Sequence, residues 1–171
     1  GNETHPENIG TISYCNENYD VIEKEDELDN IIQKILENKI NKVLLISQTT
    51  YNLEKFNNIE KELKNQLYKN NIDLVIKNTI CRATELRQKE TKEIAKKADY
   101  MIIIGGKNSS NTKKLFEIAN KYCNNTVCIE TVEELDIEKL KQFETIGIMA
   151  GASTPDESIN DVINKITKKF V

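Results

Sequence analysis

The sequence predicts an α/β protein with mainly parallel sheets. Short apolar segments rich in Ile and Val alternate with longer amphipathic stretches along the 171 residues, and this alternation is typical of βαβ units. Polar residues follow four of the apolar segments and open the next helical pattern, at residues 47–50, 79–84, 105–111 and 150–154. Twelve alternating elements are many for one sheet of this length. We therefore expect two similar three-layer α/β/α halves, residues 1–78 and 79–171.

Each element rests on its own pattern. Six segments are short, apolar and bounded by polar or turn-forming residues, which predicts strands. In chain order they are residues 11–14, 42–47, 73–78, 100–104, 126–129 and 145–149. The stretches between them carry apolar residues at helical spacing with charged residues on the other face, which predicts helices. In order these are residues 26–37, 53–70, 84–98, 111–122, 132–142 and 155–170. Pro155 begins the last helix, where its missing N–H leaves no hydrogen bond unmade.

Composition narrows the class of protein. The 24 Lys and Arg residues against 28 Asp and Glu residues give a formal charge of −4, which argues against a broad nucleic-acid-binding surface. No apolar run approaches the roughly 20 residues that span a bilayer, and the first residues do not read as a secretion signal. These features predict a soluble, cytoplasmic protein.

The four cysteines are scattered along the chain rather than paired at metal-binding spacing. They are Cys15, Cys81, Cys123 and Cys128. No disulfide framework is expected in a domain of this size without a secretion signal. Spacing alone therefore indicates no metal site.

The stretch MIIIGGKNSSNTKKL, residues 101–115, runs from a predicted strand through two glycines into a predicted helix. In open α/β sheets such a junction binds ligands, because the helix presents unpaired N–H groups and the positive end of its dipole. The loop matches neither the GxxxxGK[ST] phosphate loop nor the GxGxxG dinucleotide pattern. A simple alternative stays open, a glycine turn followed by serine and asparagine helix caps.

Five motifs occur in order along the chain: THPENIG, SQTT, NTICRATELRQ, IGGKNSSNTKKL and GIMAGASTPD. Together they resemble the C-terminal part of the LytB/IspH family of 4-hydroxy-3-methylbut-2-enyl diphosphate reductases, from Gly1 to about Val162. Two positions depart from the family pattern, since Asn8 replaces an apolar residue after HPE and Met149 replaces Thr before AGAST. Family members begin well upstream of HPE. The resemblance thus implies the last part of a three-domain fold, with residues 1–78 in a partial middle domain.

The family holds a [4Fe-4S] cluster with three cysteines, and by resemblance Cys81 is one of them. The predicted helix N-terminus after Cys81 would favour the thiolate that iron requires. The alternative for any single cysteine is a small buried hydrophobic residue. That alternative is retained for Cys15, Cys123 and Cys128, which match no ligand of the family.

The HPE and SQTT motifs carry the implied catalytic residues. Glu7, in the HPE motif, resembles the family's proton donor. A carboxyl in a closed cavity beside an anion would have a raised pKa and would keep its proton for general acid catalysis. His5 resembles a residue that donates a hydrogen bond to the substrate diphosphate, as an imidazolium near neutral pH. Thr49 resembles a contact to the substrate's hydroxyl end, and Gln48 would help to place Glu7. Without the motifs, a lone histidine and a glutamate would both be assigned to the exposed surface.

The diphosphate itself would be bound by short neutral side chains. By resemblance these are Ser109, Ser110, Asn111 and Ser153. Short donors lose little rotamer entropy when a phosphate orders them. Gly105, Gly106 and Gly151 would allow close backbone approach or positive φ.

The implied reaction is reductive removal of the allylic hydroxyl from 4-hydroxy-3-methylbut-2-enyl diphosphate, giving isopentenyl and dimethylallyl diphosphate. Ferredoxin or flavodoxin would donate the electrons. With one ligand cysteine out of three, the chain alone is expected to be metal-free and inactive. Two other classes stay open, a phosphate-ligand-binding α/β module without redox chemistry and a partner-binding scaffold.

Overall fold

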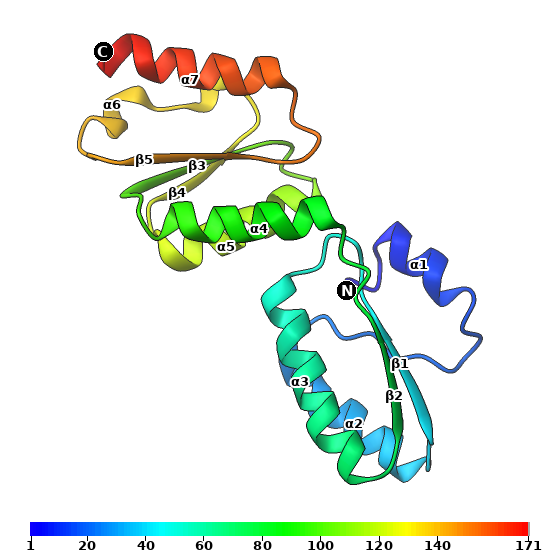
Figure 1. Ribbon diagram of the computed structural model, residues 1–171. Helices are drawn as coiled ribbons and strands as arrows, with labels where there is room; N and C mark the ends of the chain where they lie inside the picture. The colour runs from blue at the N-terminus through cyan, green and yellow to red at the C-terminus, as the bar shows by residue number, and fades with distance from the viewer. Residues whose placement is uncertain (171) are drawn as a thin grey trace. The chain divides into compact units, whose positions relative to one another are not determined.

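The computed structural model describes residues 1–170 and consists of two compact units, Gly1–Cys81 and Arg82–Val171. Every paired strand in both units is parallel to its neighbour. The predicted α/β class with parallel sheets is therefore confirmed (Figure 1). No helix within residues 1–170 combines the length and the apolar character needed to cross a membrane.

The first unit is built around a two-stranded sheet. Its elements are α1 (Pro6–Ile12), the 3-10 turn η1 (Glu25–Glu27), α2 (Leu28–Glu37), β1 (Lys42–Ile46), α3 (Leu53–Lys69) and β2 (Asp73–Lys77). The register of β1 on β2 runs from Lys42 opposite Asp73 to Ile46 opposite Lys77. Four of these six elements, α2, β1, α3 and β2, lie within a few residues of a predicted element of the same type, and η1 occupies the start of the helix predicted at residues 26–37.

The predicted strand at residues 11–14 is wrong, because residues 6–12 form α1 and a turn follows. Pro6 stands in the first turn of α1, and the Nδ1 of His5 accepts a hydrogen bond from the Glu7 N–H at its start. Ile9 and Ile12 are three residues apart, which suits a helix as well as a short strand. Pro6 in the first turn and the N-cap His5 favour the helix over a strand.

Helices α2 and α3 pack on one face of this sheet. The core contains buried side chains from both helices, among them Leu28, Ile32 and Ile35 of α2 and Phe56, Ile59, Leu63 and Leu67 of α3. Val43 and Leu45 of β1 pack against this core, whereas Leu44 and Ile46 are 59% and 39% exposed. Of the three layers expected for this half, the described residues thus form the sheet and the helix layer on one of its faces.

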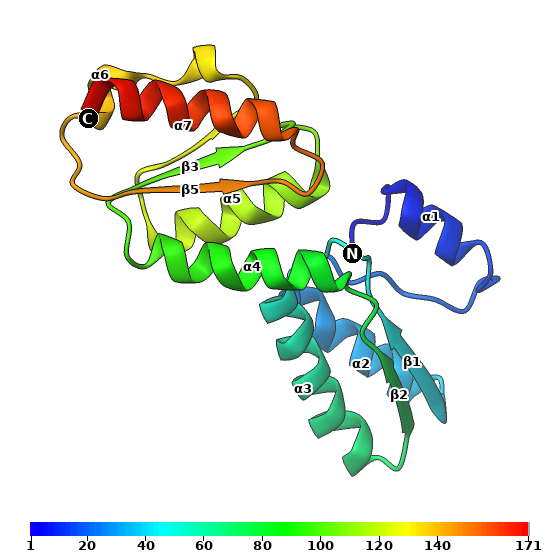
Figure 2. The ribbon, with the colours of Figure 1, turned by 45° about the horizontal axis from the view of Figure 1, so that its top comes forward.

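The second unit contains a three-stranded sheet in the order β4-β3-β5. Its elements are α4 (Arg82–Ala95), β3 (Tyr100–Ile104), α5 (Ser110–Tyr122), β4 (Thr126–Ile129), η2 (Val132–Glu134), α6 (Ile137–Leu140), β5 (Ile146–Ala150) and α7 (Asp156–Phe170). All five residues of the central strand β3 are buried. Ile102 and Ile104 face one core, while Met101 and Ile103 face the other. Helices α4 and α5 cover one face and α6 and α7 the opposite face, which completes three layers (Figure 2).

The single helix predicted at residues 132–142 is wrong. The structure has the turn η2 and the short helix α6 instead. Leu135 between them is extended and buried in the core. Asp136 then caps α6 by accepting a hydrogen bond from the Lys139 N–H at 3.2 Å. The core contact of Leu135 and the new cap divide the segment.

Candidate functional site

In the first unit, the side chain of Glu7 is bound by Thr49 from the loop after β1. The Thr49 N–H donates to Glu7 Oε1 at 2.8 Å, and the Thr49 hydroxyl donates to Glu7 Oε2 at 2.9 Å. Glu7 is half-buried and Thr49 is exposed. Two hydrogen bonds from one residue fix both the position and the rotation of the carboxyl group.

Cys81 lies beside the same loop. Its N–H donates to the carbonyl of Thr49 at 3.0 Å, and its thiol is free and exposed. Thr79 ties the loop after β2 to the loop after β1, because the Ser47 N–H donates to Thr79 Oγ1 at 3.0 Å and the Thr79 hydroxyl bonds back to the Ser47 carbonyl. The ends of two adjacent parallel strands thereby bring Glu7, Thr49 and Cys81 together.

His5 and Gln48 hold the segment that carries Glu7. His5 Nδ1 accepts a hydrogen bond from the Glu7 N–H at 3.3 Å, which ties the imidazole to the start of α1. Gln48 is 5% exposed, and its Oε1 accepts from the Asn2 N–H at 3.2 Å and from Asn8 Nδ2 at 3.4 Å. Gln48 therefore contacts residues on either side of Glu7.

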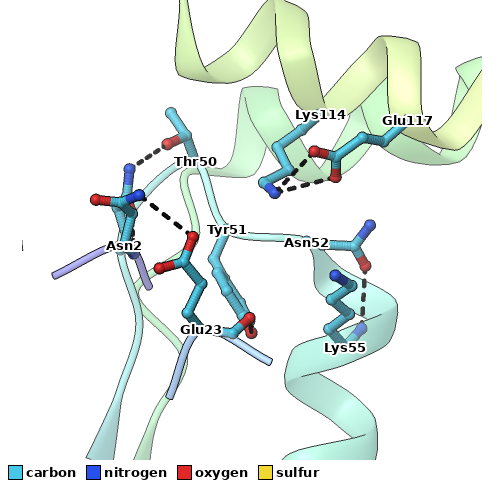
Figure 3. A network of polar contacts seen from close by, with 9 residues as sticks. Asn2, Glu23, Thr50, Tyr51, Asn52, Lys55, Lys114 and Glu117 are labelled. Carbon is cyan, nitrogen blue, oxygen red and sulfur yellow. Dashed lines mark hydrogen bonds and ion pairs between the residues drawn. The ribbon is translucent and has the colours of Figure 1, made fainter. Parts of the chain in front are cut away.

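A polar network anchors the start of the chain, and Figure 3 shows Asn2, Glu23 and Tyr51 within it. Asn2 Nδ2 donates to Glu23 Oε1 at 3.3 Å, and the Tyr51 hydroxyl donates to the Glu23 carbonyl at 3.2 Å. The Asn8 amide donates to the Asn2 carbonyl at 2.6 Å. Sequence reasoning missed Asn2, Asn8 and Glu23 as supports of Glu7. The only available signal was that Asn8 departs from the family pattern.

In the second unit, Ser109 is the N-cap of α5. Its Oγ accepts a hydrogen bond from the Thr112 N–H at 3.3 Å, and Ser110 begins the helix. Gly105, at the end of β3, has φ +149°, a value that favours glycine. The simple alternative of a glycine turn with a serine cap is thus part of the structure.

Asn111 does not cap the helix. It is 7% exposed, and neither its Nδ2 nor its Oδ1 has a hydrogen-bond partner among the described residues. An amide left buried without partners costs free energy, so native proteins rarely keep one without a reason. A ligand with both donor and acceptor capacity, or with acceptors and a bound water, would satisfy it.

The loop after β5 meets the loop after β3 at the same sheet edge. The Gly151 N–H and the Thr154 hydroxyl both donate to the Ile104 carbonyl, at 2.9 Å and 3.0 Å. A Cβ on Gly105 would lie 2.7 Å from Thr112 Oγ1, and one on Gly151 would lie 2.6 Å from the same atom. The two glycines therefore let the loops close around Thr112. Ser153 lies in the second loop and is exposed.

The cysteines differ in their suitability as metal ligands. Cys81 is exposed, whereas Cys123 is buried, and burial raises the pKa of the Cys128 thiol above its usual value. Within residues 1–170, no group of three or more His, Cys, Asp or Glu side chains is placed to hold a metal ion. Of the four cysteines, Cys81 is the exposed one and Cys15 and Cys128 are half-buried.

Comparison with known proteins gives a consistent match. The family model described as LytB protein matches residues 1–167. A 4-hydroxy-3-methylbut-2-enyl diphosphate reductase of Clostridium perfringens (strain SM101) is 45% identical over 168 residues, covering 97% of this chain and 55% of the relative. The reductase of Campylobacter concisus is 44% identical, with 98% and 58% covered. The chain thus spans about half the length of the curated relatives it matches.

Two solved structures resemble this one. The E-1-hydroxy-2-methyl-but-2-enyl-4-diphosphate reductase from Plasmodium falciparum is 29% identical with a TM-score of 0.81, covering 98% of this chain and 51% of that one. An (E)-4-hydroxy-3-methyl-but-2-enyl diphosphate reductase, described as the terminal enzyme of the non-mevalonate pathway, is 39% identical with a TM-score of 0.52. It covers 98% of this chain and 57% of that one.

Proposed function

Because this chain belongs to the LytB protein family, we propose that it forms part of a reductase that converts 4-hydroxy-3-methylbut-2-enyl diphosphate to isopentenyl and dimethylallyl diphosphate. The observation that carries the proposal is the convergence of Glu7, Thr49 and Cys81 through hydrogen bonds of Thr49. A proton donor, a hydroxyl and a free thiol at one sheet edge suit proton-coupled reduction better than simple ligand binding.

Glu7 is the proposed proton donor. Its Oε1 accepts from the Thr49 N–H, which cannot accept in return, so a proton on Glu7 resides on Oε2. Oε2 lies 2.9 Å from Thr49 Oγ1, and with a protonated carboxyl the hydroxyl would accept this hydrogen bond instead of donating it. Thr49 keeps the carboxyl oriented and would pass the proton to the leaving hydroxyl of the substrate.

Cys81 is the proposed ligand that this chain contributes to a [4Fe-4S] cluster. When bound, such a cluster supplies electrons and an iron that acts as a Lewis acid toward the substrate oxygen. The exposed thiol, directly before the N-terminus of α4, supports the assignment, since a helix N-terminus favours a thiolate. The other two ligands would come from sequence outside these 171 residues.

The diphosphate is proposed to bind in the second unit, at the edge where β3 and β5 end. The unpartnered amide of Asn111 supports this most directly. Ser109, Ser110 and Ser153 would add hydroxyl donors. His5, in the first unit, stays a proposed substrate-binding residue through its place in the HPE motif.

The proposal extends to the cellular setting. Ferredoxin or flavodoxin would supply the electrons, and the protein would act in the cytoplasm.

An activity assay on the longer protein, purified without oxygen, tests the function. With a chemically reduced electron carrier, we expect consumption of the allylic diphosphate and formation of both isoprenoid diphosphates. A protein that binds the diphosphate tightly but never reduces it would instead be the phosphate-binding module. Substitution of Cys81 by Ser should abolish turnover and bleach the cluster absorbance.

A further inference from the structure

The loop between β3 and α5 contains a β-turn at residues 106–109. The Ser109 N–H donates to the Gly106 carbonyl at 2.9 Å, the hydrogen bond that closes such a turn. Lys107 and Asn108 occupy its central positions and are exposed. The turn is followed directly by Ser109, the N-cap of α5, and by Asn111. The backbone geometry of the turn therefore sets the positions from which these two side chains project.

Two carboxylates from the segment after β4 hold this turn. Glu130 Oε1 accepts a hydrogen bond from the Lys107 N–H at 2.6 Å, across 23 residues of sequence. Glu134 accepts from the Glu130 N–H at 3.1 Å through Oε1, and its Oε2 pairs with the Lys107 ammonium. Backbone and side chain of Lys107 are thus bound by different glutamates, and the glutamates are bound to each other.

This arrangement is unexpected beside a site for an anion, because carboxylates repel phosphate. The ion pair reduces that repulsion: the Glu134 hydrogen bond raises the pKa of Lys107, and the Lys107 hydrogen bond lowers the pKa of Glu134. Both groups are therefore charged near neutral pH and offset one another. The role left for Glu130 is structural. Its carboxylate accepts the Lys107 N–H, and without this hydrogen bond the turn would be free to rearrange.

We propose that Glu130 is a positioning residue of the diphosphate site, acting through the Lys107 N–H to hold the turn at residues 106–109. This inference rests on the proposed function for the identity of the ligand. Glu130 does not touch the diphosphate; it orders the backbone that presents Ser109 and Asn111.

Two measurements on the 171-residue chain test the inference. The first is calorimetric titration with inorganic diphosphate, comparing wild type with Glu130→Ala, Glu130→Gln and the control Glu133→Gln, an exposed acid of the same segment. The second is the NMR signal of the Lys107 amide, whose chemical shift and hydrogen exchange report its bond to Glu130.

We expect Glu130→Ala to weaken diphosphate binding about tenfold, the scale of one lost hydrogen bond to a charged group, with an unchanged melting temperature. The Lys107 amide should shift upfield and exchange faster. Glu130→Gln keeps an acceptor oxygen and should recover part of the affinity, which a purely electrostatic role would not allow. Glu133→Gln should behave as wild type.

Equal affinity and an equal Lys107 amide signal in Glu130→Ala and wild type would overturn the inference. Tighter binding in both Glu130 variants would also overturn it, because the carboxylate would then act only by repulsion. A wild-type chain that binds no diphosphate would overturn the ligand assignment of the proposed function. The amide signal would in that case still decide whether Glu130 orders the turn.

Discussion

The carboxyl group of Glu7 and residue Thr49 are joined by two hydrogen bonds, from the Thr49 N–H at 2.8 Å and from its hydroxyl at 2.9 Å, although 42 residues separate them. Glu7 lies on the short helix α1, and Thr49 lies in the loop after β1. The carbonyl of Thr49 also accepts the N–H of Cys81. One residue thus links the proposed proton donor to the proposed cluster ligand.

The first prediction concerns Glu7→Gln in the longer protein. The amide retains an oxygen that can accept the Thr49 N–H, so the fold and substrate affinity should persist. It has no proton to transfer, and kcat should fall by about 10²-fold or more, the usual scale for a general acid. Steady-state kinetics with the cluster content measured in parallel would check this.

The matched variants at Thr49 separate proton transfer from positioning. Thr49→Ser keeps the hydroxyl bonded to Glu7 Oε2, and Thr49→Val removes it while keeping the backbone N–H. We expect Thr49→Ser to retain most of the turnover and Thr49→Val to lose it. Near-normal turnover in both Glu7→Gln and Thr49→Val would remove this pair from the mechanism.

The second prediction concerns Asn111→Ala. If the unpartnered amide binds the diphosphate, the variant should weaken binding of substrate and of inorganic diphosphate by about 1 to 3 kcal/mol. The free energy of unfolding without ligand should hardly fall, because the substitution removes a buried amide that has no protein partner. Asn120→Ala, an exposed position on the same helix, is the control. Unchanged affinity in Asn111→Ala would contradict the assignment.

The third prediction concerns the thiols of the isolated chain. Cys81 is exposed and should react rapidly with iodoacetamide, whereas buried Cys123 should react only on unfolding. The raised pKa of Cys128 lowers its thiolate fraction and should slow its alkylation. Mass spectrometry after timed quenching gives the order.

The same chain should take up no stable cluster. Within residues 1–170 no three possible ligand side chains lie together, so anaerobic treatment with iron and sulfide should leave the chain colourless after desalting. Stoichiometric iron with a thiolate-to-iron absorption band would show that other residues of this chain complete the ligand set.

The fourth prediction concerns the pH dependence of the Lys107–Glu134 pair. The pKa of Glu134 is lowered, first by its hydrogen bond from Lys107, so the pair's contribution is complete above the usual glutamate pKa and is lost as pH falls through the lowered value. The pKa of Lys107 is raised, so the contribution also disappears as pH rises through that value. Carboxyl NMR should show Glu134 titrating below the usual glutamate pKa. Its midpoint should rise toward the usual value in Lys107→Met and at high salt.

Much of the fold could be predicted from sequence because its signals are local. The strands Tyr100–Ile104 and Thr126–Ile129 begin and end where the apolar runs do. The two errors arose where local patterns were ambiguous. The segment 11–14 is too short to distinguish the two-residue period of a strand from the 3.6-residue period of a helix. The segment 132–142 has a helical pattern, but the buried Leu135 interrupts the helix. Burial in the core is a property of the folded unit.

The sequence by itself determined the family, since its motifs resemble those of one family, and through that resemblance it indicated which residues to propose for the site. Only the tertiary structure decided which of these residues contact one another. It placed Thr49 between Glu7 and Cys81, assigned the helix cap to Ser109 and left Asn111 without a partner. It also brought Glu130 to the Lys107 amide. The contacts Thr49–Cys81 and Lys107–Glu130 join residues far apart in the chain, and they form because parallel strands bring their loops to one sheet edge, which no local pattern encodes.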